Sequence, residues 1–349
     1  MKGMFLSKES VVPFIEHLAS QQKVFAPNKK VHGSITFEEV NDANDVVLNY
    51  ARALLSVKKY FLPQRETLLK YKLDDNSFEK QEIEQVNAIF LGVHNYDLQA
   101  VLKLDYNFKN NNPEKNYLKR REGAVFVGIS YEPDNFHFSQ SVGIDPHNTN
   151  GFDLFLHKTE EGFVLEVLTK SGEKLLDGFG EISEFQGEYP RNENFNASLY
   201  APQSKLKEVF ANSYDNPIWK EMAEKCVGCG TCNLTCPTCF CFNVEDNVGI
   251  TLKDGSRDRH LDGCMLRGFT EVAGGEIFRD ELAGRMRHRI YRKFKYISDI
   301  TGEPWCVGCG RCTIFCPAGI SIVDIVNRLV SDYDKQQVLN EGQMTSVLD

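Results

Sequence analysis

The sequence predicts a two-domain protein, with a mixed α/β N-terminal domain and a mainly α-helical C-terminal domain. Three observations predict it. Short apolar runs typical of buried strands occur within the first 182 residues, apolar residues recur at helical spacing in the last third, and all 11 cysteines lie between Cys226 and Cys316. A length of 349 residues is enough for two domains of ordinary size.

Residues 1–182 combine helical and strand patterns. A short amphipathic helix near the start is indicated by Phe14, Ile15 and Leu18. The runs Ala88–Val93 and Ala124–Ile129 are apolar throughout, as expected of buried strands. Two further runs flank Glu160-Glu161-Gly162 and predict a β-hairpin, namely Asp153–His157 and Phe163–Thr169. We therefore expect an α/β domain over residues 1–182.

Residues 183–215 read as a linker, because periodicity is lost and Asn, Pro and Ser accumulate from Ser183 onward. Residues 216–349 are expected to be mainly helical. One stripe recurs every four residues, at Leu282, Met286, Ile290 and Phe294. Another, with Ser321 placed to cap its helix, consists of Ile322, Ile325, Val326, Leu329, Val330 and Tyr333.

Basic residues accumulate on the first of these helical segments. They are Arg285, Arg287, Arg289, Arg292, Lys293 and Lys295. The simpler interpretation is a solvated helix face. The alternative is that they offset a negatively charged cofactor or dock an acidic partner.

Composition excludes some functions. The net charge of -9 lacks the basic footprint that nucleic-acid binding requires. No apolar run of about 18 residues could span a membrane, and the first twenty residues make a poor signal peptide because Lys8, Glu9 and Pro13 interrupt them. We therefore expect a cytoplasmic protein without a membrane span.

The cysteines form one internal repeat. Cys226-Val-Gly-Cys229-Gly-Thr-Cys232-x3-Cys236-Pro237 recurs eighty residues later, and the second copy reads Cys306-Val-Gly-Cys309-Gly-Arg-Cys312-x3-Cys316-Pro317. Both copies match the C-x2-C-x2-C-x3-C-P run of two-cluster ferredoxins. In a reducing compartment, cysteines grouped in this way are metal ligands rather than disulfides. The C-terminal domain is therefore predicted to be a dicluster ferredoxin-like domain with two [4Fe–4S] clusters.

The spacing also predicts the ligand sets. Three closely spaced thiolates wrap three corners of a cubane, and the fourth cysteine crosses to the other cluster. The first cluster is assigned to Cys226, Cys229, Cys232 and Cys316. The second is assigned to Cys306, Cys309, Cys312 and Cys236. A pair of zinc sites is the alternative, but a third cysteine at the same spacing has no role in a tetrahedral zinc site.

Three cysteines remain, and they are Cys239, Cys241 and Cys264. They could be small buried hydrophobic residues beside the clusters. They could instead form a third metal site with His260 or Asp262 as a further ligand, and such a site would make the chain an autonomous enzyme that binds substrate there.

The chain resembles the family that comprises the dicluster iron–sulfur subunit of anaerobic sulfite reductase and the beta subunit of [NiFe] sulfhydrogenases. The resemblance is carried by the two cysteine runs together with Pro237–Phe242, Cys264 and Ala273-Gly-Gly275. Upstream landmarks are Lys58–Glu66, Gly92-Val-x-x-x-Asp97 and Gly151-Phe-Asp-Leu154. Coverage thus extends over nearly the whole chain.

The resemblance implies an electron-transfer subunit. In that family the subunit passes electrons between a flavin- and NAD(P)-binding reductase subunit and a catalytic subunit with a [NiFe] or sirohaem centre. No dinucleotide-binding G-x-G-x-x-G occurs between a strand and a helix, so no catalytic site is expected in this chain itself. Residues 1–182 would then serve as a docking domain.

One departure from the family is visible. The resemblance implies four N-terminal cysteines where this chain has Tyr96, Tyr131, His137 and Ser139. If those cysteines hold a further cluster in the family, this chain lacks the ligands for it.

Overall fold

The computed structural model describes residues 2–110, 112–191 and 194–345, which divide into two compact units. The first unit comprises Met1–Pro133, Asp145–Asn194 and Phe240–Leu261. The second comprises Asp134–Ile144, Phe195–Cys239 and Asp262–Asp349. Each unit is therefore assembled from three separate stretches of the chain.

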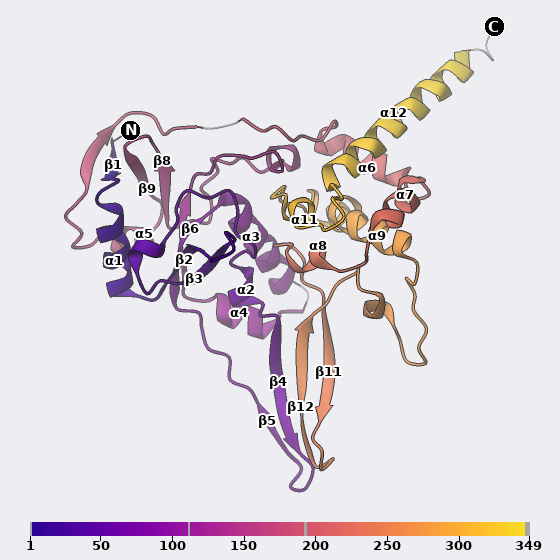
Figure 1. Ribbon diagram of the computed structural model, residues 1–349, viewed down its shortest axis with the longest axis horizontal. Coiled ribbons are helices and arrows are strands. Elements are labelled where there is room, and N and C mark those ends of the chain that lie inside the picture. The colour runs from indigo at the N-terminus through magenta and orange to yellow at the C-terminus, as the bar shows by residue number, and fades with distance from the viewer. Residues whose placement is uncertain (1, 111, 192–193, 346–349) are drawn as a thin grey trace. The chain divides into compact units, whose positions relative to one another are not determined.

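An eight-stranded sheet forms the centre of the first unit (Figure 1), in the order β10-β1-β9-β8-β7-β6-β2-β3. The neighbours β2, β6, β7 and β8 run parallel, and the other pairs are antiparallel. The strands are β1 (Lys2–Ser7), β2 (Val24–Lys29), β3 (Ile35–Glu39), β6 (Ala88–Val93), β7 (Ala124–Ile129), β8 (Leu154–Lys158), β9 (Gly162–Val167) and β10 (Ser183–Gln186). The predicted buried strands and the predicted hairpin of β8 and β9 are confirmed.

Helices cover both faces of this sheet. On one face, α1 (Val11–Gln21) buries its predicted apolar side against Ile89, Leu91 and Val127. The other face carries the short α2 (Lys58–Phe61), α3 (Asn95–Lys109) and α4 (Lys115–Arg121), which pack around Phe90 and Phe126. Each large side chain buried in this way stabilises the fold by about 1.5–3 kcal/mol. The remaining helical turns of the unit are η1 (Ala43–Asp45) and α5 (Lys170–Lys174).

A second, four-stranded sheet also belongs to the first unit. Its order is β11-β12-β4-β5, with β4 (Arg65–Lys72), β5 (Ser77–Lys80), β11 (Phe242–Val248) and β12 (Asp254–Leu261). Arg259 on β12 fixes this sheet to α4, because it pairs with Glu66 of β4 and, at 2.9 Å, with the N-cap residue Glu114. The expectation of a mainly helical region over residues 216–349 therefore does not hold for the two long strands β11 and β12.

The second unit is helical. Its helices are η2 (Gln140–Val142), α6 (Gln203–Ala211), α7 (Ile218–Lys225), α8 (Thr231–Leu234), η3 (Arg267–Thr270), α9 (Leu282–Tyr291), the π-helical turn η4 (Arg292–Tyr296), α10 (Ile297–Thr301), α11 (Arg311–Ile314) and α12 (Ile322–Thr345). Both predicted helical stripes are confirmed, and Ser321 caps α12 by accepting a 3.1 Å hydrogen bond from the Asp324 N–H. None of the described helices is long and apolar enough to cross a membrane.

Candidate metal centre

The two cysteine runs have the same backbone conformation. In each run both glycines adopt positive φ, with 68° and 75° at Gly228 and Gly230 and 64° and 72° at Gly308 and Gly310. This conformation is accessible to glycine at little cost. In each run the first glycine N–H points at the first cysteine, and the N–H to Sγ distance is 3.4 Å from Gly228 to Cys226 and from Gly308 to Cys306. Backbone N–H groups directed at sulfur are the donors that tune an iron–sulfur site.

Each run then continues into a short helix, and both helices lie in the second unit. α8 follows Gly230 and carries Cys232, whereas α11 follows Gly310 and carries Cys312. The sequence repeat is thus a structural repeat.

Two thiols of the first run share a cavity with two thiols of the second run. Cys226, Cys232 and Cys316 line it, together with Cys312. The rest of the lining is Met265, Met286, Arg289, Ile290, Ile320, Ile322 and Ile325. Three of the four cysteines that the sequence assigned to the first cluster are therefore brought together around one largely apolar space.

Cys229, the fourth member of that set, is exposed, and hydrogen bonds from Thr231 lower the pKa of its thiol. Burial raises the pKa of Cys232 to about 12. Cys229 lies just before α8 and Cys232 lies in α8. The more exposed and the more enclosed thiol of this run are therefore only three residues apart.

Thiols of the second run lie near the crossing cysteine of the first run. Burial raises the pKa of Cys306 to about 12, and neighbouring sulfurs, including those of Cys312, Cys309 and Cys236, add to this effect. The Cys239 thiol donates a hydrogen bond to Cys236 and lowers the pKa of Cys236 well below its ordinary value. Cys236 is therefore close to the run with which the sequence grouped it.

The described cysteines lie around a cavity rather than at a single point. Among the residues that the structure describes, no three or more His, Cys, Asp or Glu side chains converge closely enough to hold one metal ion. A cubane separates its ligands by its own width, which suits thiols arranged around a cavity.

Three residues of the basic segment are buried, so the interpretation as a solvated helix face is wrong for them. Arg285, Arg289 and Lys293 are 8%, 6% and 4% exposed. Arg289 donates to the Cys232 carbonyl at 3.2 Å, and the Lys293 ammonium donates to the Thr238 hydroxyl at 2.6 Å. Burial works against both charges, yet the pKa values of Arg289 and Lys293 are raised because the surrounding cysteine sulfurs favour a cation.

Two of the three remaining cysteines lie beside the same asparagine side chain. The buried Asn233 amide nitrogen lies 3.6 Å from Cys239 Sγ and 3.5 Å from Cys264 Sγ. Cys241 lies in the segment Phe240–Leu261 of the first unit. His260, considered as a further ligand, is also in the first unit and lies 3.8 Å from the Glu245 carboxylate. The Asp262 carboxylate accepts from the Gly263 N–H at 2.6 Å.

The four positions where the resemblance implied cysteines are occupied by well-packed side chains. In the first unit, the Tyr96 hydroxyl donates to the Ala51 carbonyl at 2.8 Å, and the Tyr96 and Tyr131 rings are 5.0 Å apart. In the second unit, His137 and Ser139 are both fully buried, and the His137 imidazole lies 2.9 Å from the Asp134 carboxylate.

One contact of the second cysteine run has no signature in the sequence. Gly308 lies so close to Ser139 that a Cβ at Gly308 would be 2.4 Å from the Ser139 Cα, and the Phe138 N–H donates to the Gly308 carbonyl at 2.9 Å. Residues 138–139 therefore support the loop that carries Cys306 and Cys309. Nothing in the local sequence could have indicated this contact across some 170 positions.

Comparison with known proteins supports these features. The family model of the 4Fe-4S dicluster domain matches residues 225–320. Sulfhydrogenase 2 subunit beta of Pyrococcus furiosus is 33% identical over 343 residues, which cover 94% of this chain and 98% of the relative. The 2-oxoglutarate dehydrogenase E1 component of Staphylococcus saprophyticus is 22% identical over 145 residues, which cover 37% of this chain and 15% of that protein. No solved structure matches.

Proposed function

Because this chain belongs to the family of sulfhydrogenase beta subunits, with a 4Fe-4S dicluster domain, we propose that it is the electron-relay subunit of a larger oxidoreductase. Its partners would be a flavin- and NAD(P)-binding reductase subunit and a catalytic subunit with a [NiFe] or sirohaem centre. A hydrogenase is the favoured assembly, since the relative carries that name. The reducing cytoplasm, where thiols stay available as ligands, is the compartment that suits it.

The observation that carries the proposal is that cysteines of the two runs lie close to one another. Cys316 lines the cavity of Cys226 and Cys232, and Cys236 lies near Cys306. We assign Cys226, Cys229, Cys232 and Cys316 to one cluster, and Cys306, Cys309, Cys312 and Cys236 to the other. This reciprocal pattern is that of two-cluster ferredoxins, in which the fourth cysteine ligates the other cluster.

A bound [4Fe–4S] cluster supplies reversible one-electron chemistry. The residues of the chain determine where the cluster lies and set its reduction potential. The Gly228 and Gly308 N–H groups direct positive dipoles at Cys226 and Cys306. The exposed Cys229 leaves one edge of the first site near the surface, where an electron could enter or leave.

Paired substitutions test the exchange. Anaerobically purified protein should contain about eight iron atoms and about eight sulfides per chain. Cys226→Ala combined with Cys316→Ala removes two ligands of one cluster, so about half of the iron should remain. Cys226→Ala combined with Cys236→Ala removes one ligand from each cluster, so nearly all of the iron should be lost.

The two double variants are matched, because each lacks one cysteine of the first C-x2-C step and one crossing cysteine. Iron and sulfide analysis together with electron paramagnetic resonance of the reduced protein gives the result. The opposite pattern would show that each run supplies all four ligands of its own cluster. Wild-type protein without inorganic sulfide would overturn the proposed function.

The second candidate function is an autonomous enzyme with a substrate-binding third metal site at Cys239, Cys241 and Cys264. One observation favours it, since Cys239 and Cys264 both lie within 3.6 Å of the Asn233 amide nitrogen. The same hydrogen bonds also explain why the buried Cys264 and the half-buried Cys239 lie together without a metal, and we therefore prefer the relay.

Cys264→Ser distinguishes the two functions. Because serine keeps a hydrogen-bonding group beside Asn233, the relay predicts that iron content and the paramagnetic signals stay at wild-type levels. Loss of iron, or of a signal that shifts when substrate is added, would instead support the third site. Asn233→Asp is measured alongside Cys264→Ser. It keeps the shape of the side chain beside Cys239 and Cys264 and adds a carboxylate that could act as a metal ligand.

A further inference from the structure

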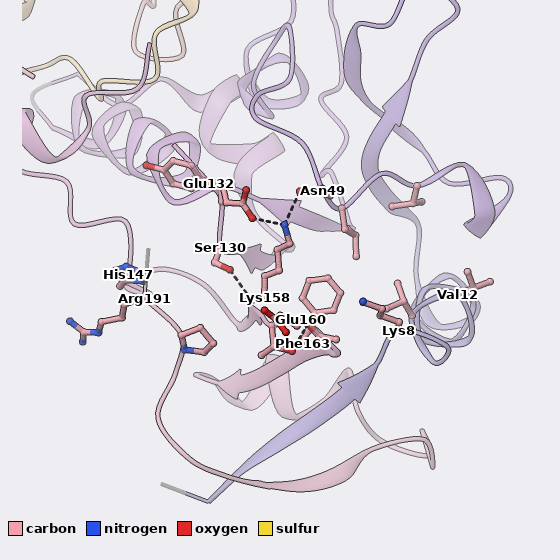
Figure 2. Close-up of a pocket in the computed structure, with 17 residues that line it drawn as sticks. Lys8, Val12, Asn49, Ser130, Glu132, His147, Lys158, Glu160, Phe163 and Arg191 are labelled. Carbon is pink, nitrogen blue, oxygen red and sulfur yellow. Dashed lines mark hydrogen bonds and ion pairs between the residues drawn. The ribbon is translucent and has the colours of Figure 1, made fainter. Parts of the chain in front are cut away.

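The first unit contains a large cavity that the electron relay does not use. Its volume is about 780 Å³, within the range of ligand sites for small molecules. Every residue that lines it belongs to the first unit. Figure 2 shows the pocket with its lining side chains.

The cavity lies where ligands bind in sheets of this kind. β7 ends at Ile129 and β8 at Lys158, and the residues that follow both strands line the cavity. β1 runs in the same direction as β8, since both are antiparallel to β9, and Lys8 follows its carboxyl end. Crevices outside the carboxyl ends of parallel strands are the usual ligand sites of open α/β sheets.

One side of the cavity is an apolar wall, which consists of Val11, Val12, Val46, Leu48 and Phe163. These side chains belong to the apolar core between α1 and the sheet, and they are its members that face the cavity. An apolar wall of this extent suits a flat ring better than a small inorganic ion, because a bare ion gains nothing from apolar surface.

Two lysines, Lys8 and Lys158, line the cavity. Lys158 donates to the Glu132 carboxylate at 2.7 Å and to the Asn49 side-chain oxygen at 2.9 Å. An ammonium has three donors, so one remains for a ligand. Figure 2 shows this side chain, held by both partners, in the middle of the pocket, with Lys8 extending toward it from the end of β1.

Other polar groups of the cavity are available for a ligand. Within the described chain, no hydrogen bond or ion pair engages the Lys8 ammonium. Both imidazole nitrogens of His147 are buried and have no partner among the described residues. Buried polar atoms are rarely left without partners, so such a group on a cavity wall points to a ligand. Cations at the cavity outnumber carboxylates, with Lys8, Lys158 and Arg191 against Glu132 and Glu160, although the chain as a whole is acidic.

We propose that this cavity binds a mononucleotide. Its phosphate pairs with Lys8 and Lys158, its ring lies against the apolar wall, and its sugar hydroxyls reach polar groups such as His147. Phosphate with lysine provides a charge-assisted contact. The volume exceeds what a phosphate alone would fill. This inference does not rest on the cluster assignment, since no cysteine lines the cavity.

Calorimetric titration of the intact, anaerobically purified chain tests the proposal. AMP and FMN each carry a ring and a phosphate, and at least one of them should bind saturably at one site per chain. Adenosine or riboflavin, which lack the phosphate, and inorganic phosphate, which lacks a ring, should bind at least about tenfold more weakly. Weak binding by every probe, or equal binding with and without phosphate, would overturn the proposal.

Three variants locate the site. Lys8→Met and Lys158→Met should each weaken binding about tenfold or more, because each removes a charged partner of the phosphate. Val12→Trp should block binding by filling the space beside the apolar wall while keeping both lysines. Lys174→Met, an exposed lysine of α5 outside the cavity, is the matched control and should leave affinity unchanged.

Lys8→Met should leave folding intact, because the Lys8 side chain is exposed. If affinity is unchanged in Lys8→Met and in Val12→Trp, the nucleotide binds elsewhere and the proposal is wrong. Iron content is measured in the same samples and should equal that of wild type in every variant. A change in iron alone would concern the relay and not this cavity.

Discussion

At the scale of single residues, the unusual feature is a pair of buried cations among cysteine sulfurs. Arg289 and Lys293 are separated by one helical turn, and burial alone would make each of them costly. The nearby sulfurs of Cys232 and Cys236 make the charged forms favourable. Two loaded clusters carry net negative charge through their thiolates, so we interpret these cations as their internal counter-charges.

Lys293→Met should lower the reduction potential of the cluster assigned to the second run. Removing a nearby positive charge disfavours the added electron, and at an effective dielectric constant of about 20 the shift is on the order of 50 mV. A redox titration followed by electron paramagnetic resonance measures it. Lys295→Met is the control, because Lys295 instead forms a 2.7 Å ion pair with Asp299 and should shift the potential much less. Equal shifts in both variants would refute the role assigned to Lys293.

At the scale of elements, the two cysteine loops share a conformation but differ in what surrounds them. At Gly308, an added Cβ would lie 2.4 Å from the Ser139 Cα and backbone nitrogen. At Gly228, the nearest atom to an added Cβ is a Leu282 methyl at 3.7 Å. At its first glycine the second loop is therefore packed against backbone, whereas the first loop has room at the equivalent glycine.

Alanine at these two glycines separates conformational strain from packing. Both positions have φ near 65°, so each substitution should cost about 1–2 kcal/mol of unfolding free energy through strain alone. Gly308→Ala should cost a further 1–3 kcal/mol or so, because the new methyl group meets the Ser139 backbone. Anaerobic denaturant titrations of the loaded protein provide both values. Equal losses would indicate that residues 138–139 move away from the loop at little cost.

The elements that the sequence predicted are those with a clear pattern of apolar residues. β6 and β7 are apolar along their whole length and buried, and the α12 stripe repeats at helical spacing. By contrast, β11 is exposed at every position and largely polar, so no burial pattern marks it. Its partner β12 pairs with β4, nearly 190 residues earlier, and only the tertiary fold specifies that pairing.

The candidate site was predictable to a similar extent. Regular spacing revealed eight cysteines and suggested their exchange, since ligand geometry is local within each run. Burial of Arg289 and Lys293 was not predictable, because the sulfurs that favour their charges come from loops distant in sequence. The cavity beside Lys158 was also missed, since its lining comes from several separated stretches of the chain.

At the scale of the whole molecule, the two units differ in what stabilises them. The first unit has helices packed on both faces of an eight-stranded sheet, with apolar cores on each side. The second unit consists of short helices and two cysteine loops, and its buried cations include Arg289 and Lys293. Metal ligation in such a unit contributes directly to folding, because a preformed site rarely exists in the unfolded chain.

Removal of iron should therefore affect the second unit far more than the first. When iron is removed, the cysteine thiolates take up protons, and Arg289 and Lys293 lose their counter-charges. The cost of burying an uncompensated charge is several kcal/mol. After anaerobic chelation, hydrogen exchange measured by mass spectrometry should accelerate in α8, α9 and α11, while β6 and β7 stay protected. Loss of protection in both units at once would mean that they unfold together. Unchanged exchange in α8 and α11 would mean that the loops hold their shape without metal, in which case cysteine side chains that stay ionised as thiolates must balance the buried cations.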